Sequence, residues 1–372
     1  MPNVFVNAVN SKVGGGKNIL NNYLQELATH KSEYSFFILT PNYDEYKSYN
    51  CSHIEILKFN KYYSSTLFIL FLYFLKIPAI LKKKKIDVVF NFSDMIIPTK
   101  VGQIYFFDWP YAVYDADYIW KRMSLKDWIH RKIKIFFIHL YIKKVKLTIA
   151  QTNNIAKRLR EKFNLADVVV IKTPIATNFN AVDNIFDFEL PNNQKKFLFP
   201  ASYSSHKNFQ IILKLALLMK SKQLDYVIVL TIDKKIANCY LKKIRALDLD
   251  NIINLGTVLI HKMPSLYKQC DALLFPTLLE TYGLPYIEAF EFELPIVTSD
   301  LDFAHEICEN LAYYFDPFDE VSILSAMNRV FQNLDNLAER KRLGKIKNSS
   351  IPKWRDVVVD FNKQIKFVLS KN

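Results

Sequence analysis

Glycine is scarce in this chain, with seven residues among 372. The sequence has no Gly-x-Gly-x-x-Gly fingerprint and no acidic residue at the end of a second predicted strand, so dinucleotide binding is not indicated. Five of the glycines fall in three loops that follow predicted strands: Gly14 to Gly16, Gly256 and Gly283. Because glycine lets the backbone approach a phosphate or a sugar closely, these loops are candidate ligand sites.

Cysteine is also sparse, and the four cysteines form no Cys-x-x-Cys pair. They lie in or near apolar segments, which predicts reduced thiols in a cytosolic protein. The sequence shows no cluster of metal-ligand residues, and we expect no metal and no other cofactor. The amino terminus has neither a basic region nor the cleavage site of a signal peptide, which also favours a cytoplasmic location.

Long apolar runs are absent as well. A membrane-spanning helix needs about 18 consecutive apolar residues, and no run reaches that length. The candidate segment 66–81 begins with ten mostly apolar residues from Thr66 to Leu75, and four lysines follow it at 82–85. We expect a buried or interfacial helix here.

Acidic residues are depleted in the first half only. Residues 1–180 hold 26 Lys and Arg against 13 Asp and Glu, whereas residues 181–372 hold 24 against 23. Within the first half, Trp120 to Lys146 holds nine basic residues, one acidic residue and five aromatic residues. Such a segment is typical of an amphipathic helix on an anionic membrane surface, and a core helix with solvated lysines is the alternative.

Short apolar, β-branched runs alternate with amphipathic stretches along the chain. Twelve runs are predicted strands: 4–8, 35–40, 87–91, 102–107, 147–151, 168–171, 196–199, 226–231, 252–255, 272–275, 296–298 and 313–315. The alternation predicts α/β architecture, with one doubly wound parallel sheet in each half. The predicted domains are 1–172 and 195–352, joined by a linker at 173–194. The last segment, 353–372, is a predicted helix that packs back on the first domain.

Two carboxylates, Glu280 and Glu288, stand eight positions apart around Gly283. Glu280 falls in the loop after the predicted strand 272–275, where open α/β sheets bind ligands. Gly283 indicates the start of a helix, whose first N–H groups point at an anion. These groups belong to Tyr282, Gly283 and Leu284. Sugar hydroxyls could donate to either carboxylate, and the alternative is that both glutamates serve only the helix dipole.

A lysine stands where the helix dipole disfavours a cation. Lys207 lies between the predicted strand 196–199 and a helix expected to begin near Asn208. Because the start of a helix is already positive, a bound diphosphate would explain a lysine there. A solvated lysine near a helix end is the alternative.

An ordered series of segments in the second half resembles the retaining glycosyltransferases of family 4. The series is His206-Lys-Asn, Leu255-Gly256, Tyr267 to Asp271, Phe275 to Phe290, Leu294 to Ser299, His305-Glu-Ile and Phe315-Asp-Pro. It includes the Glu-x7-Glu motif of that family. The resemblance implies the GT-B fold, in which two Rossmann-like domains face each other across a cleft and the C-terminal helix crosses back to the first domain.

The resemblance also implies roles for single residues. Glu280 would contact the hydroxyls of the donor sugar, and Glu288 would hold the nucleotide ribose. Lys207 would neutralise the leaving diphosphate in place of a metal ion. Further donor contacts would come from Gly15, Gly16, Ser202, His206, Gly256, Thr257, Tyr282, Gly283 and Leu284. The acceptor would attack from the face that the diphosphate leaves, so no protein nucleophile is required.

The sequence departs from the family at three places. Ser202 stands where many members have an arginine, and His206 is a candidate to compensate. Glu293-Leu294 replaces a turn that usually contains glycine.

The third departure is in the first domain, where many members have a histidine near the reacting centre. Here Asp108 is the best polar candidate for a catalytic role, with Trp109 and Tyr111 beside it to stack on a sugar. A structural role for Asp108, as a turn residue before Pro110, is the alternative.

The sequence therefore predicts a metal-independent retaining hexosyltransferase. It would move a sugar from a UDP- or GDP-sugar to a glycan, carried on a lipid, in bacterial surface polysaccharide synthesis of the O-antigen or capsule type. The basic first half would meet an anionic membrane, which places the protein peripherally on the inner face of the plasma membrane.

Two other classes stay open. One is a GT-B nucleotide-sugar epimerase or polymer synthase. The other is a non-catalytic protein that uses its basic half to bind a membrane or nucleic acid. We recognise no nucleic-acid motif, and no nucleic-acid partner is expected.

Overall fold

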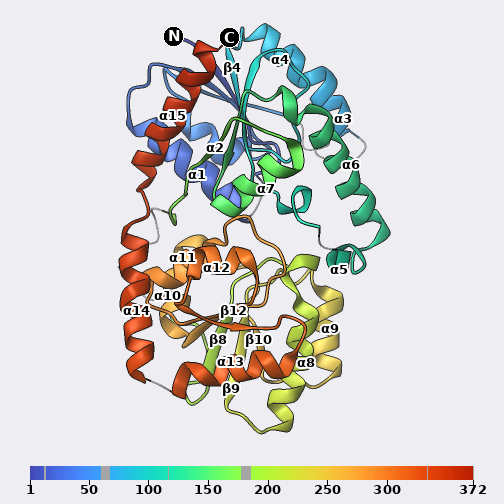
Figure 1. The fold of residues 1–372 in the computed structure, drawn as a ribbon, viewed down its shortest axis with the longest axis vertical. Helices are drawn as coiled ribbons and strands as arrows, with labels where there is room; N and C mark the ends of the chain where they lie inside the picture. The colour runs from blue at the N-terminus through green and yellow to red at the C-terminus, as the bar shows by residue number, and fades with distance from the viewer. Residues whose placement is uncertain (12–13, 60–67, 116, 177–185, 333, 372) are drawn as a thin grey trace. The chain divides into compact units, whose positions relative to one another are not determined.

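The computed structural model describes residues 1–11, 14–59, 68–115, 117–176, 186–332 and 334–371. The chain divides into two compact units. Unit 1 comprises Met1–Pro174 and Pro352–Asn372, and unit 2 comprises Ile175–Ile351. Each unit contains one parallel sheet with its own helices (Figure 1). Residues 177–185 of the predicted linker lie outside the described residues.

Unit 1 has a seven-stranded parallel sheet in the order β3-β2-β1-β4-β5-β6-β7. Its strands are β1 (Asn3–Asn7), β2 (Ser35–Leu39), β3 (Ile54–Leu57), β4 (Val88–Asn91), β5 (Gly102–Phe106), β6 (Leu147–Ala150) and β7 (Val168–Val170). The sequence did not predict β3. This strand has four residues, lies at the sheet edge and alternates buried Ile54 and Ile56 with exposed Glu55, so its apolar character is weak.

Helices cover both faces of this sheet. They are α1 (Gly14–Thr29), α2 (Tyr43–Tyr46), α3 (Ile69–Phe71), α4 (Ile77–Lys83), α5 (Asp117–Trp120), α6 (Leu125–Tyr141), α7 (Asn153–Phe163) and α15 (Trp354–Ser370). Val4 and Val6 of β1 pack with α1 and α15, whereas Phe5 packs with α3 and α4 on the other face. Because successive strand residues point to opposite faces, both faces of the sheet are apolar. The prediction that the C-terminal helix packs on the first domain is confirmed.

Two helix predictions in unit 1 need correction. From Ile69 to Lys83 the chain is helical, but a π-helix, η3 (Leu72–Lys76), separates α3 from α4. Residues 66 and 67 of that prediction lie outside the described residues. The single helix predicted for Trp120 to Lys146 is wrong, because α5 ends at Trp120 and α6 begins at Leu125. Ser124 caps α6: its Oγ accepts from the Asp127 N–H at 3.2 Å and donates to the Asp127 carboxylate at 2.8 Å.

Unit 2 has a six-stranded parallel sheet in the order β10-β9-β8-β11-β12-β13. Its strands are β8 (Lys195–Phe199), β9 (Tyr226–Leu230), β10 (Ile252–Asn254), β11 (Ala272–Phe275), β12 (Ile296–Ser299) and β13 (Ala312–Phe315). Its helices are α8 (Phe209–Ser221), α9 (Asn238–Ala246), α10 (Met263–Gln269), α11 (Leu284–Glu291), α12 (Asp302–Cys308), α13 (Glu320–Gln332) and α14 (Leu334–Ser349).

All twelve predicted strands are present, with ends within one residue of the prediction. The doubly wound α/β class is therefore confirmed for both halves. No helix in the described part of the chain is long and apolar enough to cross a membrane.

Candidate active site

The strand order reverses once in each sheet, and the candidate residues follow strands at these reversals. In unit 2 the reversal lies between β8 and β11, which pair in parallel. Lys207 follows β8 and Glu280 follows β11. In unit 1 the reversal lies between β1 and β4, and the glycine triplet at 14–16 follows β1. Open α/β sheets bind ligands in the crevice at such points.

A short 3₁₀ turn, Ser205–Lys207, presents Lys207 just before α8. The next residue, Asn208, has φ 57° and ψ 36°, in the left-handed region that asparagine tolerates better than most residues. Its side-chain amide donates to the Pro317 carbonyl at 2.7 Å, which fixes the turn. The cation that the sequence predicts at this helix start therefore lies on a turn that the Asn208–Pro317 hydrogen bond fixes.

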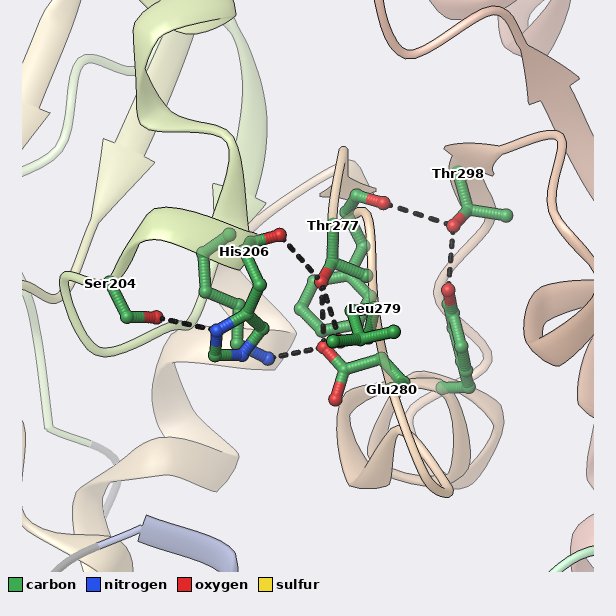
Figure 2. Close-up of polar contacts among 9 residues, drawn as sticks. Ser204, His206, Thr277, Leu279, Glu280 and Thr298 are labelled. Carbon is green, nitrogen blue, oxygen red and sulfur yellow. Dashed lines mark hydrogen bonds and ion pairs between the residues drawn. The ribbon is translucent and has the colours of Figure 1, made fainter. Parts of the chain in front are cut away.

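Lys207 and Glu280 form a partly buried ion pair, and Figure 2 shows Glu280 beside Thr277. The Lys207 ammonium contacts Glu280 Oε1, and each side chain is 13% exposed. Thr277 Oγ1 donates to the same oxygen at 2.8 Å, and Lys207 Nζ lies 4.8 Å from the centre of the Phe275 ring. The structure therefore brings together the two residues expected at the donor sugar and the diphosphate.

Hydrogen bonds also join the two loops that carry this pair. The Leu278 N–H donates to the His206 carbonyl at 2.8 Å, and Ser204 Oγ lies 3.2 Å from His206 Nδ1. Ser202, earlier in the same loop, is exposed. His206 is thus tied to the loop that carries the ion pair. The contacts of Thr277 and Leu278 were missed by sequence reasoning, because they join loops about 70 residues apart.

Gly283 begins α11 with φ 82°, a conformation that residues with a side chain rarely adopt. A Cβ atom at this position would lie 2.7 Å from the Tyr286 ring. That ring cannot easily move, because Tyr286 is fully buried and its hydroxyl lies 2.8 Å from Thr298 Oγ1. Glycine is therefore required here, and the backbone of Tyr282, Gly283 and Leu284 lies at the start of the helix as predicted.

Glu288 lies in the second turn of α11 and is 8% exposed. The Tyr267 hydroxyl, from α10, donates to Glu288 Oε2 at 2.6 Å. Burial raises the pKa of Glu288 to about 7, and the hydrogen bond from Tyr267 partly offsets this rise. Its carboxyl group therefore changes charge near neutral pH. The partner stands 21 positions earlier in the chain, in a segment that belongs to the family resemblance but in which no role was predicted for Tyr267 itself.

Gly256 and Thr257 follow β10 near the start of α9. Gly256 has φ 75°, and its N–H donates to Asn254 Oδ1 at 3.2 Å. The pKa of Asp233 is lowered mainly by a hydrogen bond from the Ile236 N–H, and a hydrogen bond with Thr257 lowers it further. This loop offers backbone and hydroxyl groups at the carboxyl ends of β9 and β10.

Gly15, Gly16 and Asp108 belong to unit 1. A Cβ atom at Gly16 would lie 3.4 Å from Asp108 Oδ2, so the structure brings Asp108 to the first turn of α1. Burial raises the pKa of Asp108 to about 8; the charge of Asp94 adds to the rise and that of Lys134 opposes it. This carboxyl group is therefore largely protonated at pH 7.

The expected stacking role of the two neighbouring aromatic residues is wrong. Trp109 and Tyr111 are only 8% and 4% exposed. Lys134 Nζ lies 5.5 Å from the Trp109 ring centre, and the Arg131 guanidinium lies 4.2 Å from that of Tyr111. Because cations from α6 cover these rings, neither ring presents a free face to a sugar.

Comparison with known proteins agrees with this geometry. The family "Glycosyl transferases group 1" matches residues 182–348. The O-antigen chain mannosyltransferase RfbU of Salmonella typhimurium is 23% identical over 211 residues, which cover 55% of this chain and 56% of RfbU. The chain thus spans about half the length of the curated relative it matches.

Two solved structures share the whole fold. Sucrose-phosphate synthase from Thermosynechococcus elongatus has a TM-score of 0.75 at 10% identity, with all of both chains covered. Anabaena HepE in complex with UDP and glucose has a TM-score of 0.69 at 14% identity, also with all of both chains covered. Together with the two parallel sheets, these likenesses show the GT-B fold. The match to the glycosyl transferases group 1 family thus falls on unit 2, which carries Lys207, Glu280 and Glu288.

Proposed function

We propose that this protein is a retaining, metal-independent glycosyltransferase that uses a UDP- or GDP-sugar as its donor. The observation that carries the proposal is the Lys207–Glu280 pair at the strand reversal of the group 1 domain, beside the start of α11. HepE, which has the same fold, is described with UDP and glucose bound. RfbU, named as an O-antigen chain mannosyltransferase, supports a glycan acceptor in surface polysaccharide synthesis.

The chemistry follows from the charges at this site. When the bond between the anomeric carbon and the diphosphate breaks, positive charge builds on the sugar and negative charge on the leaving phosphate. Lys207 and the first N–H groups of α11 stabilise the phosphate, and Glu280 holds the sugar hydroxyls. The acceptor hydroxyl attacks the anomeric carbon from the face that the diphosphate leaves, and its proton passes to a phosphate oxygen. The products are a glycoside with the donor's anomeric configuration and a nucleoside diphosphate.

A surface of unit 1 supports a membrane-bound acceptor. Ten large apolar side chains are exposed in two segments: Phe68, Leu70, Phe71, Phe74, Leu75, Leu125, Trp128, Ile129, Phe136 and Leu140. The ring centres of Phe74 in η3 and Phe137 in α6 lie 5.7 Å apart, so the helical segment that begins with α3 runs beside α6 (Figure 1). Lysines flank both segments. Exposed apolar residues flanked by lysines suit binding to an anionic lipid surface. We call these ten residues and their flanking lysines the apolar-basic patch, and we propose that the patch binds an anionic membrane.

A transfer assay in EDTA tests the proposed function. Purified protein is given UDP- and GDP-hexoses with free and lipid-linked glycan acceptors, and NMR gives the anomeric configuration of the product. We expect transfer with retained configuration, which Glu280→Ala and Lys207→Ala each abolish while circular dichroism shows a folded chain. An inverted product, a strict metal requirement or full activity in both variants would contradict the proposal.

A further inference from the structure

Two polar side chains of unit 1 meet the first turn of α1. Ser11 Oγ and Asp108 Oδ2 lie 3.8 and 3.4 Å from the position of a Cβ atom on Gly16. Ser11 is 2% exposed, and its hydroxyl has no hydrogen-bond partner within the described ranges. A buried polar group without a partner loses the hydrogen bonds that it makes to water in the unfolded chain. The free hydroxyl therefore points to a ligand that completes its hydrogen bonding beside Gly16.

An ion pair stands behind Asp108. Lys134 Nζ, from α6, contacts Asp94 Oδ2 at 2.5 Å, and the two side chains are 14% and 18% exposed. Asp94 lies three residues past β4 in a loop that Asn91 holds, since Asn91 Nδ2 donates to the Met95 carbonyl at 2.8 Å. The pair thus joins α6 to the strand ends at the reversal of unit 1.

The groups around Asp108 favour its neutral form at neutral pH. Burial is the largest cause of its raised pKa, Asp94 adds to the rise, and Lys134 opposes it. Tyr105 also faces Asp108, and burial raises the Tyr105 pKa far enough to keep its hydroxyl neutral. On α6, burial and the charge of Lys134 lower the pKa of His130, which keeps the imidazole neutral too. Asp94 and Lys134 are therefore the charged groups that act on Asp108.

We propose that Asp94, fixed by Lys134, is a positioning residue that keeps Asp108 a neutral hydrogen-bond donor beside Gly16. The inference rests on the proposed function, together with the expectation from the family resemblance that Gly16 contacts the donor. An ionised Asp108 would repel a phosphate and would itself occupy the positive end of α1. A neutral carboxyl group donates a hydrogen bond to a phosphate or sugar oxygen instead, as buried acids do in other enzymes. The Ser11 hydroxyl supplies a second donor.

Opposite shifts in two variants test this inference. UDP, with GDP as the second probe, is titrated calorimetrically from pH 7 to 9.5, where a phosphate is already ionised. Wild-type affinity falls as the pH rises through about 8, because Asp108 ionises. Asp94→Asn removes a repulsion and moves this fall to lower pH; Lys134→Met removes an attraction and moves it to higher pH. Each shift is about one pH unit.

Two further variants sharpen the test. Asp108→Asn has no acidic proton to lose at this position, so its affinity does not fall as the pH rises through about 8. Lys157→Met alters an exposed lysine on α7, outside the proposed site, and follows the wild type. The same fall in affinity in Asp108→Asn as in the wild type, with the fold intact, would overturn the proposal.

Carbon-13 NMR of the aspartate carboxyl groups gives a readout that needs no nucleotide. The signal that disappears in Asp108→Asn titrates near pH 8 in the wild type and moves in opposite directions in the other two variants. Titration of this signal near 3.8, or shifts of the same sign in both variants, would overturn the inference. The predicted shifts without any nucleotide binding would instead overturn the proposed function.

Discussion

Removing one member of the Lys207–Glu280 pair should destabilise unit 2 more than removing both. In Lys207→Met, the Glu280 carboxylate keeps its hydrogen bond from Thr277 but loses its cation. In Glu280→Gln, the ammonium loses its opposite charge but keeps the face of the Phe275 ring. The double variant places a neutral amide beside an apolar side chain of similar length and leaves no unmatched charge.

The burial of the pair sets the magnitude. Each side chain is 13% exposed, so solvent screens the charges only weakly. Breaking a buried pair typically costs 3–5 kcal/mol, and we expect about 3 kcal/mol for either single variant because some exposure remains. Replacing a whole pair is often nearly neutral, so the double variant should lie within about 1 kcal/mol of the wild type. The coupling free energy of the cycle is then about 5–7 kcal/mol.

The position of the tryptophans gives this experiment an internal control. All four belong to unit 1: Trp109, Trp120, Trp128 and Trp354. Urea unfolding followed by tryptophan fluorescence therefore reports on unit 1, and far-ultraviolet circular dichroism reports on both units. We expect a lower midpoint in the dichroism of the single variants and an unchanged fluorescence midpoint. Unfolding free energies of the single variants within about 0.5 kcal/mol of the wild type would refute the reasoning, because ordinary surface substitutions have effects of that size. A double variant whose loss of stability equals the sum of the two single losses would also refute it.

Three further predictions concern the helix start, the buried glutamate and the apolar-basic patch. Gly283→Ala should lower the unfolding free energy of unit 2 by about 3 kcal/mol, from left-handed strain and the clash with Tyr286. Gly256→Ala has the same left-handed strain, but its Cβ atom would lie 3.9 Å from a side-chain carbon and clash with nothing, so it should lower the unfolding free energy by about 1 kcal/mol. Equal losses for the two variants in urea unfolding would contradict the steric argument. Burial raises the pKa of Glu288 from 4.5 to about 7, so the folded state binds the proton more tightly. Stability should therefore fall by about 3 kcal/mol as the pH rises from 4.5 through 7, and Glu288→Gln should abolish that fall in urea midpoints measured at pH 5 and pH 8. A Leu75→Ser, Phe136→Ser double variant should lose at least tenfold in sedimentation with phosphatidylglycerol vesicles and keep its urea midpoint, because both side chains are exposed. Undiminished vesicle binding would exclude the patch as the docking surface.

The sheets were predictable because buried parallel strands are short, continuous apolar runs, and such runs need no knowledge of their neighbours. The edge strand β3 was not predicted, because exposed Glu55 interrupts its apolar pattern. The break before α6 depends on the reciprocal cap of Ser124 and Asp127, which the basic, aromatic composition of the segment masked.

The site was predictable only where its chemistry is local. The spacing of Glu280, Gly283 and Glu288 indicated a ligand-binding helix start, and the structure places these residues accordingly. The partners of the buried carboxyl groups come from distant segments. Tyr267 reaches Glu288 from α10, and Lys134 reaches Asp94 from 40 positions away. Such contacts depend on tertiary packing, which periodicity and spacing do not encode.

The central claim is that Lys207 and Glu280 hold the donor, and calorimetric titration of UDP- and GDP-hexoses in EDTA tests it most directly. The double variant Lys207→Met, Glu280→Gln is the decisive comparison, because the stability cycle predicts that it folds as well as the wild type. The wild type should bind at least one of these donors. The double variant should bind that donor at least about 100-fold more weakly, which corresponds to roughly 2.7 kcal/mol. Equal affinity in the two proteins would contradict the claim.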